Sequence, residues 1–284
     1  MNLEDLEKID SQKMCQTYDK WPDIAKQRYE QEFSRPEFKD IDHVVFAGMG
    51  GSGTIGDVFS SILSKNNIHT SVVKGYLLPK TVDSNTLVVA TSISGNTDET
   101  LTVLENSVKT NAKVIALSSG GKMEEVSSKN SIPYFKINQT HSPRASLLQF
   151  LYSTLNILQE FIPIKKADIT ESLSQLKNIQ KQICSSNLTD DNPALNLAKW
   201  INTIPVIYYP AGLQAAAIRF KNSMQENAKK HVITEDVIEA CHNGIVAWEE
   251  SSNLQPILIL GKDDYVKTKE RWKILKEFFQ IKNI

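Results

Sequence analysis

The sequence predicts an α/β protein built from two doubly wound parallel-sheet domains. From residue 44 onward, short continuous apolar runs alternate with helix-length segments, a pattern that is typical of a parallel sheet covered on both faces. A glycine turn follows the first apolar run and leads into a helix, and the same order begins again at residue 205. We therefore expect a helical arm at residues 1–30, a first domain at 31–163, and a linker helix with a second domain at 164–284.

Length and composition are those of an ordinary globular protein. The 284 residues are 40% hydrophobic and 23% charged, and the formal net charge is −1. Because acidic and basic residues are interspersed, the charge pattern favours neither a nucleic acid nor a membrane partner. Cys15, Cys184 and Cys241 lie far apart, and the charged N-terminus lacks a hydrophobic signal core. These features predict a cytoplasmic protein without a disulfide framework or a structural zinc site.

The apolar pattern also predicts the individual elements. The arm should form two helical pieces over residues 2–31 that separate near Trp21 and Pro22. The first domain should have strands at 44–46, 71–73, 87–90, 114–117 and 134–137, and helices at 55–63, 99–109, 123–129 and 146–161. The second domain should have strands at 205–209, 232–234 and 256–261, and helices at 215–230, 238–242 and 265–280.

The first candidate binding element is the glycine turn, GMGGSG at residues 48–53. It includes Gly51 and Ser52 and stands between the first strand and the first helix of the sheet. Glycines let a ligand approach the backbone closely, and the free amides at a helix N-terminus attract anions such as phosphate. The alternative is a tight turn without a ligand.

The second candidate is the serine loop, residues 92–97, which follows the strand expected at 87–90. Ser92, Ser94 and Thr97 supply three hydroxyls at the carboxyl end of a strand, where open α/β sheets bind ligands. Hydroxyls and amides can hold a phosphate without a lysine. The alternative is that Ser94 or Asn96 only caps the next helix. Two such loops on one sheet predict a phosphate site between them.

These motifs, together with SSGG at residues 118–121 and PRAS at 143–146, resemble those of sugar isomerase (SIS) domain proteins. More narrowly, the chain resembles the bifunctional phosphoglucose/phosphomannose isomerases of archaea and some bacteria, from about residue 10 to its end. The resemblance implies flavodoxin-like SIS domains and a homodimer with its active site at the subunit interface. It implies a sugar-phosphate substrate without a metal or nucleotide cofactor. The implied phosphate ligands are Gly51, Ser52, Ser92, Ser94 and Thr97.

The same resemblance implies three catalytic residues. Arg144 precedes a buried helix, where its guanidinium could stabilise an enediolate oxygen; the alternative is a surface arginine. Glu226 is the implied base, whereas by charge alone it would be a solvated helix residue. His242 is the implied ring-opening group, although a lone histidine is more often structural. One departure is Gly244, which stands where the family usually has glutamate after His-Asn.

Two other functions stay open. A sugar-phosphate-binding regulator would keep both loops but would have no use for Glu226 and His242, and no DNA-binding or partner module is visible. A dinucleotide-binding Rossmann protein would match GxGxxG, which alone is a weak signal. A dinucleotide-binding protein also needs an acidic residue about twenty residues farther on to bind the ribose, and this chain lacks one. The serine loop would have no role in dinucleotide binding.

The chain ends at Ile284 in a predicted helix, and none of its last lysines lies in a motif matching the family's C-terminal catalytic lysine. We therefore expect the second domain to be incomplete, with at least one further strand and helix in the full gene product. The 284 residues should then bind sugar phosphate but isomerise it poorly. Equal kcat values for this chain and an extended one would contradict this expectation.

Overall fold

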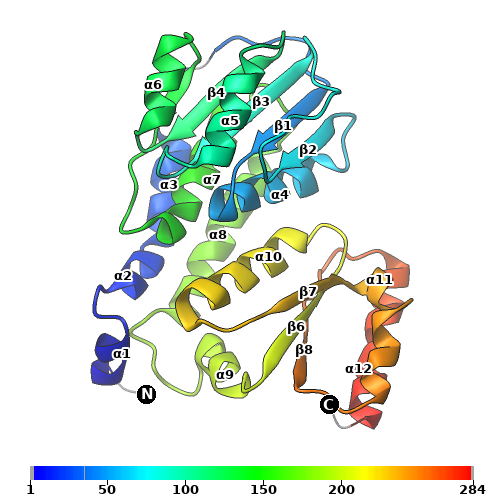
Figure 1. Cartoon of the computed structure of the whole chain (residues 1–284). Coiled ribbons are helices and arrows are strands. Elements are labelled where there is room, and N and C mark those ends of the chain that lie inside the picture. Colours follow the sequence, from blue (N-terminus) through cyan, green and yellow to red (C-terminus); the bar gives the residue numbers. More distant parts are fainter. Residues whose placement is uncertain (1–2, 35, 283–284) are drawn as a thin grey trace. The chain divides into compact units, whose positions relative to one another are not determined.

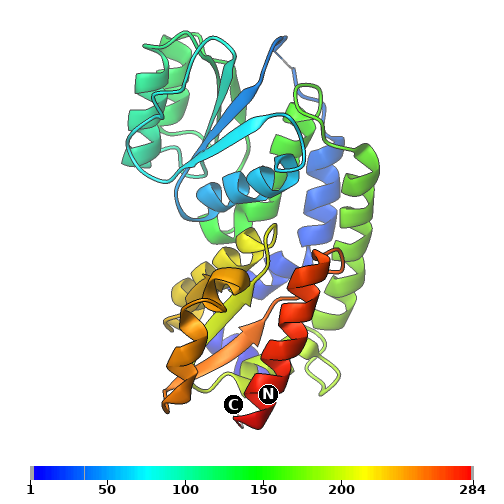
Figure 2. The same ribbon diagram turned by 90° about the vertical axis from the view of Figure 1, so that its right-hand side faces the viewer.

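The computed structural model describes residues 3–34 and 36–282 (Figure 1). Contacts divide the chain into two compact units, Met1–Asn196 and Leu197–Ile284. Residues 164–196 were expected in the second domain, whereas their contacts place them in the first unit. The reason is α8 (Lys166–Ile183), which packs beside α3 (Trp21–Glu30) and buries Ile169 in the first core (Figure 2).

A five-stranded parallel sheet forms the centre of the first unit, in the order β2-β1-β3-β4-β5. This is the flavodoxin-like order, in which the chain changes direction between β1 and β3, the point where ligands bind in such folds. β1 and β3 are buried along their whole length, as their continuous apolar sequences predict. The predicted doubly wound sheet is confirmed. The strands are β1 (His43–Ala47), β2 (His69–Val73), β3 (Thr86–Ser92), β4 (Lys113–Ser118) and β5 (Tyr134–Lys136).

Helices cover both faces of this sheet (Figure 1). Alternate residues of a strand point to opposite faces: Val89 enters the larger core with α4 and α7, whereas Ala90 enters the smaller core with α5 and α6. Ala25, in α3 of the N-terminal arm, is also buried in the larger core. The covering helices are α4 (Gly50–Leu63), α5 (Asp98–Ser107), α6 (Lys122–Lys129) and α7 (Leu147–Leu158), the last preceded by a 3-10 turn, η1 (Pro143–Ser146).

The N-terminal arm consists of α1 (Leu3–Ile9), α2 (Met14–Asp19) and α3. We expected two helical pieces; residue 2 lies outside the described residues, and the others form three helices. α2 and α3 separate at Lys20, next to the position expected from Trp21 and Pro22. Pro22 lies in the first turn of α3, where proline is tolerated, so the break comes before it. The indole nitrogen of Trp21 donates a hydrogen bond to Ala145 O at 2.7 Å, which attaches the arm to the turn before α7.

The second unit repeats the first three strands of this architecture. Its parallel sheet has the order β7-β6-β8, equivalent to β2-β1-β3. Val206 and Tyr208 pack with α11 and α12, whereas Ile207 packs with α10 on the other face (Figure 1). The elements are α9 (Pro193–Trp200), which begins in the first unit, β6 (Ile204–Tyr209), α10 (Gln214–Ser223), β7 (Ile233–Asp236), α11 (Val237–Ala240), β8 (Leu254–Leu258) and α12 (Val266–Ile281).

The helix expected at 215–230 changes its winding part-way. After Ser223 the backbone forms a π turn, η2 (Met224–Ala228), and it then ends at Lys229, which has a φ of 55°. The hydrogen bonds of a π turn span one residue more than those of an α-helix, i→i+5 instead of i→i+4. The turn changes the direction of the side chains that follow Ser223, including Glu226.

A buried histidine at the amino end of the first sheet predicts acid sensitivity. His43 is 5% exposed, and its Nε2 lies 3.0 Å from Ser71 Oγ. Burial, and then the neighbouring His69, lower the pKa of His43, against smaller opposing effects of Asp83 and Asp42. The folded state therefore favours neutral His43. Its contribution to stability is complete above the unfolded pKa, about 6.5, and is lost as the pH falls from there toward the folded pKa.

We expect the free energy of unfolding to fall between pH 7.5 and pH 5.5 less steeply in His43→Gln than in the wild type. Urea unfolding at both pH values measures the slope. The exposed His231→Gln is the control and should keep the wild-type slope. An equally steep loss in His43→Gln would assign the acid sensitivity to other groups.

Candidate functional site

The glycine turn places the exits of β1 and β3 against each other. A Cβ on Gly48 would lie 2.8 Å from Thr91 O and 2.9 Å from the Cβ of Ser52, so only glycine fits there. The N-cap residue of α4 is Met49, whose side chain accepts no hydrogen bond from the first turn. The amides around Gly51 and Ser52 therefore have no side-chain cap and can bind an anion.

The serine loop is ordered by its own hydroxyls. The hydroxyls of Ser92 and Thr97 lie 2.8 Å apart, and Gly95 N donates to Ser92 Oγ at 3.1 Å. Ser94 is exposed and accepts a bond from Asn96 N at 3.3 Å. Thr97 is the N-cap position of α5 and makes no side-chain cap bond. The alternative that Ser94 or Asn96 caps α5 is therefore not seen.

The SSGG loop, residues 118–121, supports the serine loop, a role that the sequence analysis does not assign. Asn96 Oδ1 accepts from Lys122 N at 3.1 Å, and Ser119 Oγ donates to Ile93 O at 2.7 Å. Met123 N donates to Gly95 O at 2.9 Å. These bonds join the exit of β3 to that of β4. The sequence signal for this supporting role was the SSGG motif, with its two glycines, immediately after the strand predicted at 114–117.

Arg144 lies at the same edge of the first sheet, since η1 follows the carboxyl end of β5. It is half-buried. Thr140 N donates to Ser146 Oγ at 2.9 Å, and Ala145 N donates to Ser142 O at 3.1 Å. The first unit thus places all its predicted site residues at one edge of the sheet, on turns held by hydrogen bonds: Gly51, Ser52, Ser92, Ser94, Thr97 and Arg144.

Glu226 lies in the second unit, in the π turn η2, and is half-buried rather than fully solvated. Lys229 Nζ donates to Glu226 O at 2.7 Å and so bonds the backbone of this turn. The turn follows α10 and ends the helix, a position at which wider turns occur. Glu226 therefore stands on a widened, half-buried turn and not on a regular solvated helix face.

His242 follows α11 and is exposed. The next residue, Asn243, donates to Glu239 Oε1 at 2.7 Å. A Cβ on Gly244 would lie 3.0 Å from both carboxylate oxygens of Glu235, so Glu235 occupies the space beside this turn. Burial, and then Glu239 and Asp236, raise the pKa of Glu235. Sequence reasoning missed Glu235, because its approach to Gly244 is a tertiary contact.

The second unit does not bring Glu226 and His242 together. Met224, in the turn that carries Glu226, packs on the face of the sheet that contains Ile207. Val237 and Ala240, in the helix before His242, pack on the opposite face with Tyr208. The sheet therefore separates the elements that carry the two residues.

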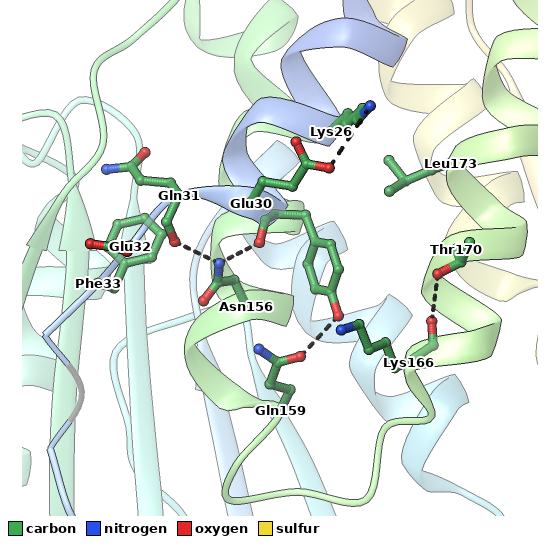
Figure 3. Close-up of a pocket in the computed structure, with 11 residues that line it drawn as sticks. Lys26, Glu30, Gln31, Glu32, Phe33, Asn156, Gln159, Lys166, Thr170 and Leu173 are labelled. Carbon is green, nitrogen blue, oxygen red and sulfur yellow. Dashed lines mark hydrogen bonds and ion pairs between the residues drawn. The ribbon is translucent and has the colours of Figure 1, made fainter.

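A cavity of about 760 Å³ in the first unit lies away from this edge (Figure 3). It is lined by α3, the end of α7 and the start of α8. α7 begins beside η1, at the carboxyl edge of the sheet. Because a helix rises about 1.5 Å per residue, α7 is long enough for its far end to lie at the amino edge. Polar groups that line the cavity bond to one another: Tyr29 OH donates to Gln159 Oε1 at 2.9 Å, and Asn156 Nδ2 donates to the backbone oxygen of Gln31 at 2.8 Å.

Among residues 3–34 and 36–282, no group of three or more His, Cys, Asp or Glu side chains is arranged to hold a metal ion. No helix in these ranges combines the length and the apolar character that a membrane span requires.

Comparison with known proteins identifies both halves of the chain. Residues 37–134 match the SIS domain family, and residues 190–284 match the bacterial phospho-glucose isomerase C-terminal SIS domain. The bifunctional phosphoglucose/phosphomannose isomerase of Caldicellulosiruptor bescii is 32% identical over 255 residues, covering 85% of this chain and 74% of that protein. This chain belongs to the bifunctional phosphoglucose/phosphomannose isomerase family. The family member from Thermoplasma acidophilum is 35% identical, covering 76% of this chain and 64% of its own length.

Solved structures agree with this assignment at the level of the fold. The C-terminal domain of glucosamine-fructose-6-phosphate aminotransferase from Francisella tularensis has a TM-score of 0.66 at 17% identity, covering 92% of this chain and 79% of its own. Glucosamine-6-phosphate deaminase from Thermotoga maritima has a TM-score of 0.62 at 15% identity, covering 93% and 82%. The chain therefore has the two-domain SIS architecture.

One relative of this isomerase family carries the name of a different reaction. The D-glucosamine-6-phosphate 4-epimerase of Sulfolobus acidocaldarius is 28% identical over 256 residues, covering 89% of this chain and 78% of that protein. Overall similarity at this level is thus compatible with more than one chemistry on a phosphorylated sugar.

Proposed function

We propose that this protein interconverts glucose 6-phosphate and fructose 6-phosphate, and mannose 6-phosphate with the same ketose, through an enediolate. The observation that carries the proposal is the position of two anion-competent loops at the carboxyl ends of β1 and β3, which are neighbouring strands of one parallel sheet. Sugar-phosphate binding by a regulator would explain the loops, but it leaves Glu226 on its π turn without a role. Family membership also favours the enzyme.

In this proposal the phosphate binds between the glycine turn and the serine loop. The ligands are the backbone amides at Gly51 and Ser52 and the hydroxyls of Ser92, Ser94 and Thr97. Backbone amides and hydroxyls need no titration to bind a dianion. They also hold the end of the substrate that does not react, which leaves C1 and C2 free for the catalytic residues.

Isomerisation requires a proton to leave C2 of the open-chain aldose and return at C1. Glu226 is the proposed base: it takes the C2 proton, and the electron pair forms the C1–C2 double bond of the enediolate. Arg144 would stabilise the charge on the enediolate oxygen. The C2 hydroxyl passes its proton to the C1 oxygen, and, as the C2 oxygen becomes the ketone, the acid form of Glu226 returns its proton to C1. These steps use no metal and no nucleotide.

His242 is the proposed ring-opening group, acting on the closed sugar before proton transfer. Because the sheet of the second unit separates its element from that of Glu226, we propose that the protein is a homodimer in which one subunit's His242 serves its partner's site. We also propose a cytoplasmic location, which is supported by three cysteines without a disulfide.

The proposed function is tested by a coupled assay of purified protein with glucose, mannose and glucosamine 6-phosphates. We expect fructose 6-phosphate from the first two substrates. Turnover of glucosamine 6-phosphate alone would reject the proposed reaction. Binding of all three without turnover would favour the regulator.

Ser94→Ala should raise KM about tenfold, the usual effect of losing a hydrogen bond to a charged group, while kcat stays near wild type. Contacts with a distant phosphate act equally in the ground and transition states, so they change KM rather than kcat. Ser64→Ala, at the far end of α4, is the matched control and should change neither constant. An unchanged KM in Ser94→Ala would remove Ser94 from the phosphate site.

A further inference from the structure

The turn that carries Arg144 contacts the loop between α1 and α2 of the N-terminal arm. His141 Nε2 donates a hydrogen bond to Gln12 O at 3.0 Å. Ser142 Oγ donates a weak hydrogen bond to the sulfur of Met14, the first residue of α2, at 3.8 Å. These two contacts attach the chain to the arm just before Arg144.

A third contact lies directly after Arg144. Trp21 Nε1, at the start of α3, donates to Ala145 O at 2.7 Å, and Ala145 is 1% exposed. The ring of Tyr18 packs edge-on against that of Trp21, with ring centroids 4.6 Å apart, which limits the orientations open to the indole. The arm thus contacts residues on both sides of Arg144.

Bonds within the turn do not by themselves account for its conformation. η1 has only four residues, and the hydrogen bonds of a 3-10 turn have poorer geometry than those of an α-helix. His141 has a φ of 57°, a left-handed conformation that is strained for a residue with a side chain and persists where surrounding contacts impose it. The hydrogen bond from His141 to Gln12 O is such a contact.

The arm is itself ordered at both ends of this contact region. Asp10 accepts hydrogen bonds from the backbone amides of the first two residues of α2, at 2.9 and 2.7 Å, and so orders the loop that contains Gln12. At the far end of α3, Tyr29 OH donates to Gln159 Oε1, directly after α7 (Figure 3). The arm therefore offers the Arg144 turn a fixed support.

We propose that the N-terminal arm is a positioning element of the active site, which holds Arg144 where its guanidinium stabilises the enediolate. Trp21 and His141 are the positioning residues. The inference rests on the proposed function, because it assumes that Arg144 meets the enediolate oxygen. A displacement of about 1 Å at a catalytic group can lower the rate about a hundredfold. Because the arm's bonds to the turn involve neither phosphate loop, loosening them should slow the reaction without weakening phosphate binding.

The test uses one variant on each side of the contact. Trp21→Phe removes the N–H donor and keeps an aromatic ring beside Tyr18. His141→Asn removes the ring that reaches Gln12 O, and asparagine tolerates the left-handed conformation. Each should lower kcat about tenfold and leave the Kd of inorganic phosphate, measured by calorimetry, within about twofold of wild type. Trp200→Phe, at a tryptophan that is 48% exposed, is the matched control and should keep the wild-type kcat.

A double-mutant cycle shows whether the arm acts through Arg144. Lysine cannot reproduce the planar fork of arginine, so in an Arg144→Lys background Trp21→Phe should change kcat by less than about twofold. An equal fall in both backgrounds would overturn the inference, because the arm would then act on the whole domain. Wild-type kcat values in both single variants would also overturn it. If Trp21→Phe does not fold, His141→Asn takes its place in the cycle, since His141 is exposed.

Failure of the proposed function is recognised separately, because wild-type protein would then bind glucose 6-phosphate without isomerising it. Amide hydrogen exchange of residues 141–146, followed by mass spectrometry, then decides whether the arm holds the turn. Faster exchange in Trp21→Phe and His141→Asn than in Trp200→Phe would support the attachment. Equal exchange in the three variants would overturn it.

Discussion

Glu226→Gln should lower kcat by about two to four orders of magnitude, the usual contribution of a positioned general base. The substitution keeps the shape of the side chain and removes the carboxylate that accepts the C2 proton. Because the phosphate ligands lie on other elements, the Kd of glucose 6-phosphate should stay near wild type. Steady-state kinetics and calorimetry on the same preparation measure both quantities.

The matched control is Glu277→Gln, an exposed glutamate on α12, which should keep the wild-type kcat. The π turn makes the comparison informative, since it is the feature that separates Glu226 from such surface residues. A normal kcat in Glu226→Gln would mean that another group moves the proton, and the assignment of the base would be wrong. A parallel loss of binding would instead point to a structural role for Glu226.

Gly95→Ala should cause a large loss of stability and of sugar-phosphate binding. Gly95 has a φ of 72°, a left-handed conformation that disfavours side chains. An added Cβ would overlap Gly120 O and lie 3.1 Å from Ser118 Oγ. Because the overlapping atom belongs to the backbone, the serine loop and the SSGG loop must separate. We expect a loss of about 3 kcal/mol or more in the free energy of unfolding, together with a strong rise in the Kd of glucose 6-phosphate.

Gly50→Ala separates backbone strain from this overlap. Gly50 lies in the same unit and has a φ of 53°, but a Cβ there meets no atom within 4 Å. The loss in the free energy of unfolding of Gly50→Ala should be limited to the strain of a side chain in the left-handed conformation, about 1 to 2 kcal/mol. Urea unfolding followed by circular dichroism measures both variants. Equal losses would show that strain alone matters and that the contact with Gly120 carries no additional energy.

Much of the fold was predictable because its signals are local. The runs at β1 and β3 are continuously apolar since both faces of these strands are covered, and such runs identify central parallel strands wherever they occur. The glycine turn and the serine loop each directly follow a strand. Their placement at one edge then follows from parallel topology alone.

Other features depended on contacts between distant segments. A helix from 215 to 230 was the natural expectation from its residues, yet packing of Met224 on the second sheet accompanies a π turn there. α8 is polar along most of its length, so its sequence does not show which domain it joins. The burial of Ile169 in the first core decides that.

The sequence by itself determined the α/β class, the strand and helix order, and the two loops expected to bind phosphate. Each depends on residue types within a few positions of one another. Only the tertiary structure decided how those loops are held: Gly95 against Gly120, and Lys74 with Asp57. These partners lie 17 to 25 positions apart, and hydrophobic periodicity carries no information about which polar side chains meet across a sheet edge.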